Sequence, residues 1–229
     1  MMILRLWIGL VLIALSMGMR AQQATDVKIE SPKGPGAGER FVDMPDSLSP
    51  LLSAVNRADL VDFIANGMKA EVENRLAGRT RMTQLSSSYI RLEHSDLAHW
   101  QMKLLPTQQG DTLICVVETV LTPVVDSHLL LYDTDWNALP LDRVLPQPPT
   151  LSDFLSPEAH AIFQSQNASA ALLLTEATFT PDENQLVIRF TTPDSVDAEV
   201  RKRLEPYLTS SITYHWQGNR FERSLPQAR

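Results

Sequence analysis

The sequence predicts an α+β fold built from two successive units, each with short helices followed by an antiparallel sheet. Apolar residues recur at helical spacing near the start of each unit. Alternating or continuously apolar runs, which are typical of strands, follow them. Between the two series, Pro146, Pro148 and Pro149 interrupt both helix and strand, because proline lacks a backbone N–H and fixes φ. We therefore assign residues 41–147 to the first unit and residues 148–229 to the second.

The first unit opens with a helical stretch that ends at Gly67. Asp46 or Ser47 is suited to cap the free N–H groups of the first turn, and apolar residues then follow helical spacing as far as Val55. A polar run ending at Asp59 interrupts the pattern. We therefore expect two short helices, the second capped by Asp59 and closed at Gly67, where glycine tolerates a positive φ.

The remainder of the first unit is predicted to be sheet. Residues 68–76 alternate apolar and charged side chains, which predicts a half-exposed strand with its charged row in water. Three turns then separate further strand patterns, of which the second places Trp100, Met102 and Leu104 on one face. Those strands are expected at residues 86–93, 98–105, 112–122 and 128–132, with 112–122 the most apolar and therefore central.

The second unit repeats the order of helix and sheet. Residues 151–163 form an amphipathic helical segment with a restart at Pro157. A hairpin follows, with strands at 172–180 and 185–191 joined by a polar turn. A helix then opens at Pro193 and is expected to kink or stop near Glu205, because Pro206 falls inside its pattern. Residues 212–223 complete the chain as a second hairpin.

The first 21 residues have the layout of a secretory signal peptide. Arg5 precedes an apolar run from Leu6 to Leu15, and small and polar residues follow up to a plausible cut after Ala21. The run is shorter than the roughly 18–20 apolar residues that span a membrane, which disfavours the alternative of a membrane anchor. Residues 22–40 are poor in apolar side chains and predict a flexible tether. We expect an exported protein, periplasmic or secreted, with no membrane span after signal removal.

The net charge disfavours one class of partner, and the cysteine content excludes an internal disulfide. The net charge is −7, and removal of Arg5 and Arg20 with the leader makes it −9. An acidic chain repels phosphate backbones, so we expect no nucleic-acid partner. Cys115 is the only cysteine, so an internal disulfide is excluded, and its apolar surroundings predict a buried residue rather than a nucleophile.

The segment Asp133–Asn137 begins like a calcium-binding loop, with the pattern D-x-D-x-N. A full loop needs glycine at its sixth position and glutamate at its twelfth, where this chain has alanine and valine. We therefore expect a strand-end turn in which an aspartate accepts backbone hydrogen bonds and the tryptophan seals the edge of the core. As candidate ligand-binding residues we name Asp133, Asp135 and Trp136, with no metal and no cofactor.

Other candidate sites are weaker. His94, Asp96 and His99 share one hairpin, but a zinc site needs further ligands, so polar turn residues are the expected interpretation. No nucleophile elbow or phosphate-binding glycine motif is present in the sequence, and we assign no catalytic residue. Four aromatic residues at strand positions are expected to be sheet core rather than a sugar-stacking face: Trp100, Trp136, Tyr214 and Trp216.

Several longer motifs resemble one protein family. FVDMPDSLSPLL, NRADLVDFIANGMKAEVENRLAG, MKLLP, YDTDWNALPL and TYHWQGNRF together are similar to the exported Bacteroidales family called domain of unknown function 3256. The likeness covers nearly the whole mature chain. It implies an exported protein and carries no catalytic residue with it. The order of helices and sheets is also similar in layout to the tandem β-lactamase-inhibitor fold, which implies nothing about function.

Two functional hypotheses follow. The first is a non-catalytic exported module that binds a protein, peptide or glycan of the cell envelope through a sheet face or edge. The second is a cell-envelope hydrolase whose site is assembled by the fold from dispersed His, Asp and Ser residues. A pocket that joins His94 or His128 to an aspartate and a serine would favour the hydrolase.

Overall fold

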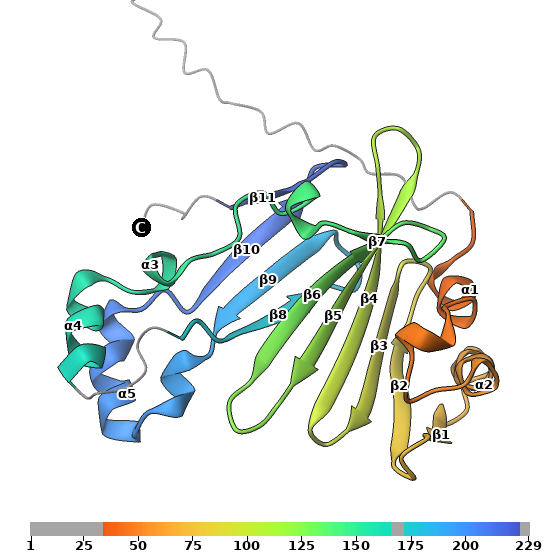
Figure 1. The fold of residues 1–229 in the computed structure, drawn as a ribbon, viewed down its shortest axis with the longest axis horizontal. Helices are drawn as coiled ribbons and strands as arrows, with labels where there is room; N and C mark the ends of the chain where they lie inside the picture. The colour runs from red at the N-terminus through yellow and green to blue at the C-terminus, as the bar shows by residue number, and fades with distance from the viewer. Residues whose placement is uncertain (1–33, 166–171, 225–229) are drawn as a thin grey trace, which may run out of the picture.

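The computed structural model describes residues 34–165 and 172–224 and contains two antiparallel sheets with helices, which confirms the α+β class (Figure 1). The predicted signal peptide, residues 1–21, and most of the predicted tether lie outside the described residues. No helix in the described ranges is long and apolar enough to cross a membrane.

The larger sheet has seven strands in sequence order, each antiparallel to the next. Its strands are β1 (Glu71–Glu73), β2 (Arg79–Leu85), β3 (Tyr89–Ser95), β4 (Ala98–Pro106), β5 (Thr112–Val120), β6 (Asp126–Tyr132) and β7 (Ala138–Leu139). The smaller sheet has the order β11-β10-β9-β8, with β8 (Thr175–Phe179), β9 (Gln185–Phe190), β10 (Ser211–Trp216) and β11 (Phe221–Arg223). The predicted strands in both halves of the chain are therefore confirmed, except in residues 68–76.

Helices flank the two sheets at opposite ends of the molecule (Figure 1). The first group consists of α1 (Ala37–Val42), the 3₁₀ helix η1 (Asp46–Leu48) and α2 (Ala54–Ala65). The second consists of α3 (Leu151–Phe154), α4 (Pro157–Ser165), η3 (Thr192–Ser195), α5 (Ala198–Leu204) and η4 (Glu205–Tyr207). The 3₁₀ turn η2 (Leu141–Arg143) lies apart from both groups, against β6. The restart at Pro157 and the change of helix type at Glu205 occur where proline predicted them.

The first helical group corrects two expectations. The stretch predicted as two helices is a single 3₁₀ turn followed by one helix, α2, which is capped by Ser53 rather than Asp59. The Ser53 hydroxyl accepts a hydrogen bond from the Asn56 backbone at 3.2 Å, so the polar run lies inside the first turns of α2. Order also begins earlier than residue 41, because α1 starts at Ala37 and that residue's N–H donates to Ser87 O at 2.9 Å.

The predicted strand at residues 68–76 is also corrected. Only Glu71–Glu73 forms a strand, and it pairs with the start of β2. The chain then turns back at once, because the Asn74 side chain accepts hydrogen bonds from the N–H groups of Leu76 and Gly78. The hydrogen bonds of Asn74 within its own turn end the strand, although apolar and charged residues continue to alternate as far as Leu76.

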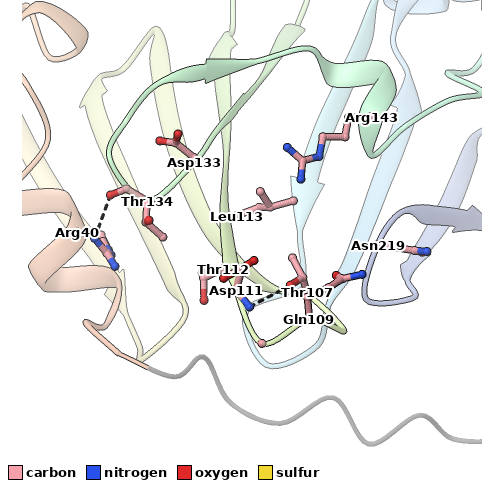
Figure 2. A pocket seen from close by; sticks show the side chains of 11 residues that line it. Arg40, Thr107, Gln109, Asp111, Thr112, Leu113, Asp133, Thr134, Arg143 and Asn219 are labelled. Carbon is pink, nitrogen blue, oxygen red and sulfur yellow. Dashed lines mark hydrogen bonds between the residues drawn. The ribbon is translucent and has the colours of Figure 1, made fainter.

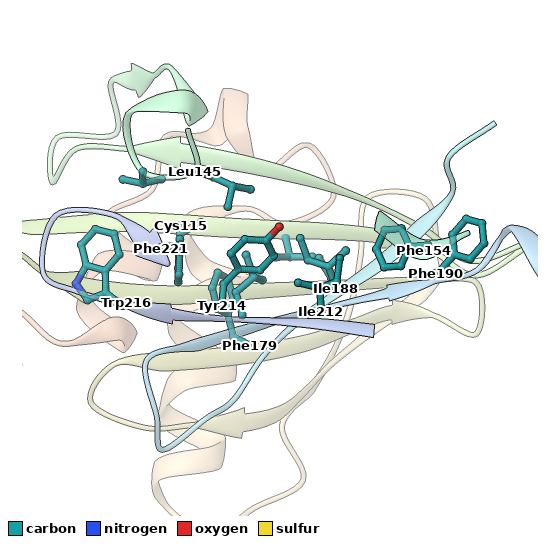
Figure 3. Packing of buried hydrophobic residues seen from close by; sticks show 14 of the residues in the cluster. Cys115, Leu145, Phe154, Phe179, Ile188, Phe190, Ile212, Tyr214, Trp216 and Phe221 are labelled. Atoms are coloured by element: carbon teal, nitrogen blue, oxygen red, sulfur yellow. The ribbon is translucent and has the colours of Figure 1, made fainter. Parts of the chain in front are cut away.

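The large sheet has a core on each face. One face packs against α1, η1 and α2, and Trp100, Met102 and Leu104 lie together on it as the sequence predicts. The opposite face packs against the smaller sheet and the second helical group. Figure 3 shows this second core, in which Cys115 of the large sheet lies opposite the aromatic residues of the small one. All strands of the larger sheet precede residue 147, and all strands of the smaller sheet follow it. That residue 147 is also a boundary between domains stays a prediction.

The two sheets meet where β8 lies along β6 and across β4 and β5. As the last strand of its sheet, β8 has one row of N–H groups without a strand partner. Side-chain oxygens of the large sheet accept from this row. The three bonds are Thr175 N–H to Asp126 (3.1 Å), Ala177 N–H to Ser127 (3.0 Å) and Phe179 N–H to Gln101 (3.1 Å).

Lys103 completes this contact from the interior of the large sheet. Its side chain is buried, and Nζ donates to the carbonyl oxygens of Pro181 at 2.7 Å and Thr180 at 3.4 Å. Burial lowers the pKa of Lys103 to about 8, although the charge of Asp182 acts in the opposite direction. The unfolded chain therefore binds one more proton than the folded chain between about pH 8 and pH 10.5.

We expect the substitution Lys103→Met to abolish a rise of stability with pH. The free energy of unfolding of the natural protein, relative to this variant, should increase on the order of 1 to 2 kcal/mol from pH 7 to pH 9.5. Urea unfolding followed by tryptophan fluorescence measures it. Lys69→Met, at an exposed lysine, should keep the natural pH dependence. Parallel curves for the natural protein and Lys103→Met would contradict the prediction.

Arg57 fixes the first helical group. Its buried guanidinium donates to the carbonyl oxygens of Leu52 (3.0 Å), Val42 (3.2 Å) and Met44, and it pairs with Asp46 at 3.0 Å. One arginine of α2 thus satisfies carbonyl groups at the end of α1 and on both sides of η1, where no regular helix supplies donors.

Replacement of Arg57 by alanine should lower the free energy of unfolding by about 2 to 4 kcal/mol, because it leaves three carbonyl groups without their donor. The matched control is Arg79→Ala, which removes an exposed pair with Glu71 and should cost less than about 1 kcal/mol. Equal losses in chemical denaturation of the two variants would show that Arg57 does not hold the helical group.

Candidate functional site

A polar cleft of about 550 Å³ opens where the two sheets and α1 meet (Figure 2). Five segments contribute to it: the end of α1, the β4–β5 turn, the loop after β6, η2 and the β10–β11 turn. The lining residues are Arg40, Thr107, Gln109, Gly110, Asp111, Thr112, Leu113, Asp133, Thr134, Arg143 and Asn219.

The two hairpin turns at this cleft are bonded to each other. Gln108 donates through its backbone N–H to Gly218 O and through its side-chain amide to Gln217 O, both at 2.9 Å. In addition, the Trp216 indole N–H donates to Pro106 O at 2.7 Å. The β4–β5 turn of the large sheet therefore has a fixed position relative to the β10–β11 turn of the small sheet.

Asp133 reaches the cleft, but its carboxylate is occupied by its own loop. Oδ1 accepts the backbone N–H groups of Asp135 and Asn137, both at 2.9 Å, and Oδ2 accepts the Asn137 side-chain amide at 3.0 Å. These bonds, first among them that from the Asn137 side chain, lower the pKa of Asp133. The predicted strand-end turn is present. Asp135 itself is exposed and adds only its backbone N–H to this network.

Trp136 points away from the cleft and into the first core. Trp136 is 7% exposed, and its ring centroid lies 5.4 Å from that of Tyr132. Its backbone has a φ of 62°. The indole N–H donates to Arg40 O at 3.1 Å, while the Arg40 guanidinium donates to Thr134 O at 2.9 Å. These two hydrogen bonds connect α1 to the loop after β6, which lines the cleft. The binding role proposed for Asp133, Asp135 and Trp136 stays a prediction.

Two charged side chains of the cleft have no partner within residues 34–165 and 172–224. They are Arg143 on η2 and Asp111 on the β4–β5 turn. Figure 2 shows them on opposite sides of Leu113. Sequence reasoning missed both, together with Arg40, because they fall in a proline-rich segment, a turn and a predicted tether. Nothing in their spacing signals that the fold brings them together.

The two histidines of the β3–β4 hairpin lie elsewhere, beside an apolar crevice of about 180 Å³. His94 Nδ1 is 3.2 Å from Thr80 Oγ1, and His99 Nδ1 is 3.1 Å from the Arg91 guanidinium. Burial lowers the pKa of His94 to about 4. In the described part of the chain, no three His, Cys, Asp or Glu side chains gather in a way that suits a metal ion.

The remaining candidates are core residues, as the sequence predicts. Trp100, Tyr214 and Trp216 are buried in the two cores. Cys115 is fully buried between the sheets, and burial raises the pKa of its thiol to about 12, so it stays protonated at neutral pH.

We expect His94 to make the fold less stable in mild acid. The folded chain keeps this ring neutral down to about pH 4, whereas the unfolded chain protonates it below about pH 6.5, so stability falls as the pH drops through this window. From pH 7 to pH 5 the natural protein should lose on the order of 1 to 2 kcal/mol more than His94→Asn.

Urea unfolding at pH 7, 6 and 5 measures this difference, with His160→Asn on the exposed side of α4 as the control. The control should follow the natural protein at all three pH values. If His94→Asn also follows it, protonation of His94 is not linked to unfolding.

Comparison with known proteins places the chain among relatives of undefined activity. The profile of the family described as "Protein of unknown function (DUF3256)" matches residues 35–221. A search of curated proteins finds no match. Among solved structures, a domain of an uncharacterized protein from Porphyromonas gingivalis W83 is similar, with 28% identity and a TM-score of 0.71. The match covers 84% of this chain and 100% of that one.

Proposed function

The chain belongs to the DUF3256 family, and we propose that it is an exported, non-catalytic binding module of the cell envelope whose ligand enters the polar cleft. One observation carries the proposal. Arg143 and Asp111, which have no partner in the described residues, face a cleft whose other charged side chains are already bonded.

Unpaired charges on fixed turns are suited to bind a ligand. A charged group held in place loses little freedom when a partner arrives, so more of the interaction energy appears as affinity. The bonds between the β4–β5 and β10–β11 turns, and those between Arg40 and the loop after β6, hold the walls of the cleft in this way. The volume of about 550 Å³ lies within the range of about 300–1,000 Å³ that is usual for ligand pockets.

Export is supported by the sequence of the leader. The basic residue, the apolar run and the small residues near Ala21 follow the order of a signal peptide. The resemblance to exported Bacteroidales proteins agrees with this assignment. The ligand should accordingly be a peptide, protein or glycan of the cell envelope.

We expect the substitution Arg143→Glu to lower ligand capture by at least about tenfold, because it reverses the charge of the arginine that would meet the ligand. The mature protein, immobilised, is incubated with envelope extract, and the retained molecules are identified by mass spectrometry. The matched control is Lys202→Glu, the same charge change on the exposed side of α5, which lies at the opposite end of the molecule from α1 (Figure 1). It should retain the same molecules as the natural protein.

Two outcomes would contradict the proposal. One is the same set of retained molecules for Arg143→Glu and the natural protein. The other is turnover of an envelope substrate by the natural protein, which would favour the hydrolase hypothesis.

Export is tested separately, by fractionation of cells that express either the full chain or a chain without residues 2–21. Only the full chain should leave the cytoplasm.

A further inference from the structure

We propose that the cleft binds a zwitterionic ligand, a short peptide with free ends, whose carboxylate pairs with Arg143 and whose ammonium group pairs with Asp111. This inference rests on the proposed function and specifies its ligand. It follows from which charges in the cleft are already in use and which are not.

The cleft is lined by two arginines and two aspartates, and one of each bonds to the wall of the cleft. Asp133 accepts three hydrogen bonds within its own loop. Arg40 donates to Thr134 O, and its own carbonyl accepts the Trp136 indole. These bonds fix Asp133 and Arg40 in the wall of the cleft. By contrast, the side chains of Arg143 and Asp111 bond to no group in residues 34–165 and 172–224, and we assign the ligand to them.

Arg143 projects from a firmly held turn. Its backbone N–H donates to Pro140 O at 3.2 Å, and the next two residues, Val144 and Leu145, are buried in the core between the sheets. Figure 2 shows the guanidinium directed into the cleft. The planar fork of N–H donors in arginine matches the two oxygens of a carboxylate, which makes a peptide C-terminus a suitable partner.

Asp111 is held equally well on the opposite side. Its N–H donates to Thr107 Oγ1 at 3.1 Å, and its carbonyl accepts the Thr107 N–H at 2.8 Å. Gly110 completes this turn with a φ of 91°. The backbone of Asp111 is therefore fixed, while its carboxylate accepts no hydrogen bond from the described residues and is suited to accept one from an ammonium group.

A ligand with a single charge would suit the cleft less well. A simple anion at Arg143 would face the negative charges of Asp111 and Asp133, and a simple cation at Asp111 would face two arginines. A zwitterion pairs with both free groups at once. The Thr112 hydroxyl and the Asn219 amide line the same cleft and offer hydrogen-bonding groups to the peptide bonds.

The probe is a pool of unblocked tripeptides, beside the same pool with acetylated N-termini and the same pool with amidated C-termini. Binding to the mature protein is measured by equilibrium dialysis with mass spectrometry. We expect both blocked pools to bind the natural protein at least about tenfold more weakly than the unblocked pool. Acetylation should make no further difference to Asp111→Asn, and amidation should make none to Arg143→Gln, because each variant lacks the partner of the blocked end.

Glu199→Gln and Lys202→Gln on the exposed side of α5 are the matched controls and should show the full effect of blocking. Thermal unfolding of every variant confirms that it is folded. Equal binding of blocked and unblocked pools overturns the inference. If no pool binds while envelope molecules are still captured in a way that depends on Arg143, the inference fails and the proposed function stands. If capture does not depend on Arg143 either, both fail.

Discussion

The docking of β8 by side chains of the large sheet is the contact on which the rest of the structure depends. An open strand edge normally pairs with another strand or invites aggregation. Here Gln101, Asp126 and Ser127 accept its N–H groups, and Lys103 donates to the carbonyl groups beyond its end. The small sheet is thereby attached at a fixed place without continuing the large one, and the core between the sheets closes.

In this arrangement, buried polar side chains of the large sheet need hydrogen-bond partners. Gln101 and Lys103 are almost inaccessible to solvent, and each would be costly to bury without partners. Both ends of the Gln101 side-chain amide are hydrogen-bonded. Its oxygen accepts from the Phe179 N–H and the Tyr89 hydroxyl, and its NH₂ group donates to Ala177 O. Arg57 acts in a comparable way for the helical layer. In both places one polar side chain serves backbone groups that regular secondary structure leaves unpaired.

Local patterns in the sequence predicted most of the sheets and little of the cleft. The shared face of Trp100, Met102 and Leu104 follows from alternation alone, because burial of one face imposes a period of two. Two of the errors arose where a side chain bonded to the backbone: Ser53 rather than Asp59 caps α2, and Asn74 ends β1. Two further elements, α1 and β2, were not predicted. The cleft residues come from separate elements, so only the path of the whole chain brings them together.

The contact between the β4–β5 and β10–β11 turns also decides where the protein can accept added sequence. Gly218 has a φ of 83°, and a Cβ atom there would lie 2.6 Å from Gln108 Cγ. A side chain at this position would strain the turn and displace the Gln108 side chain that bonds the two turns, so neither turn is a place for an inserted reporter or affinity tag. The turn between β1 and β2, where Leu76 is 78% exposed, lies away from both the cleft and this contact and is the better site for such a label.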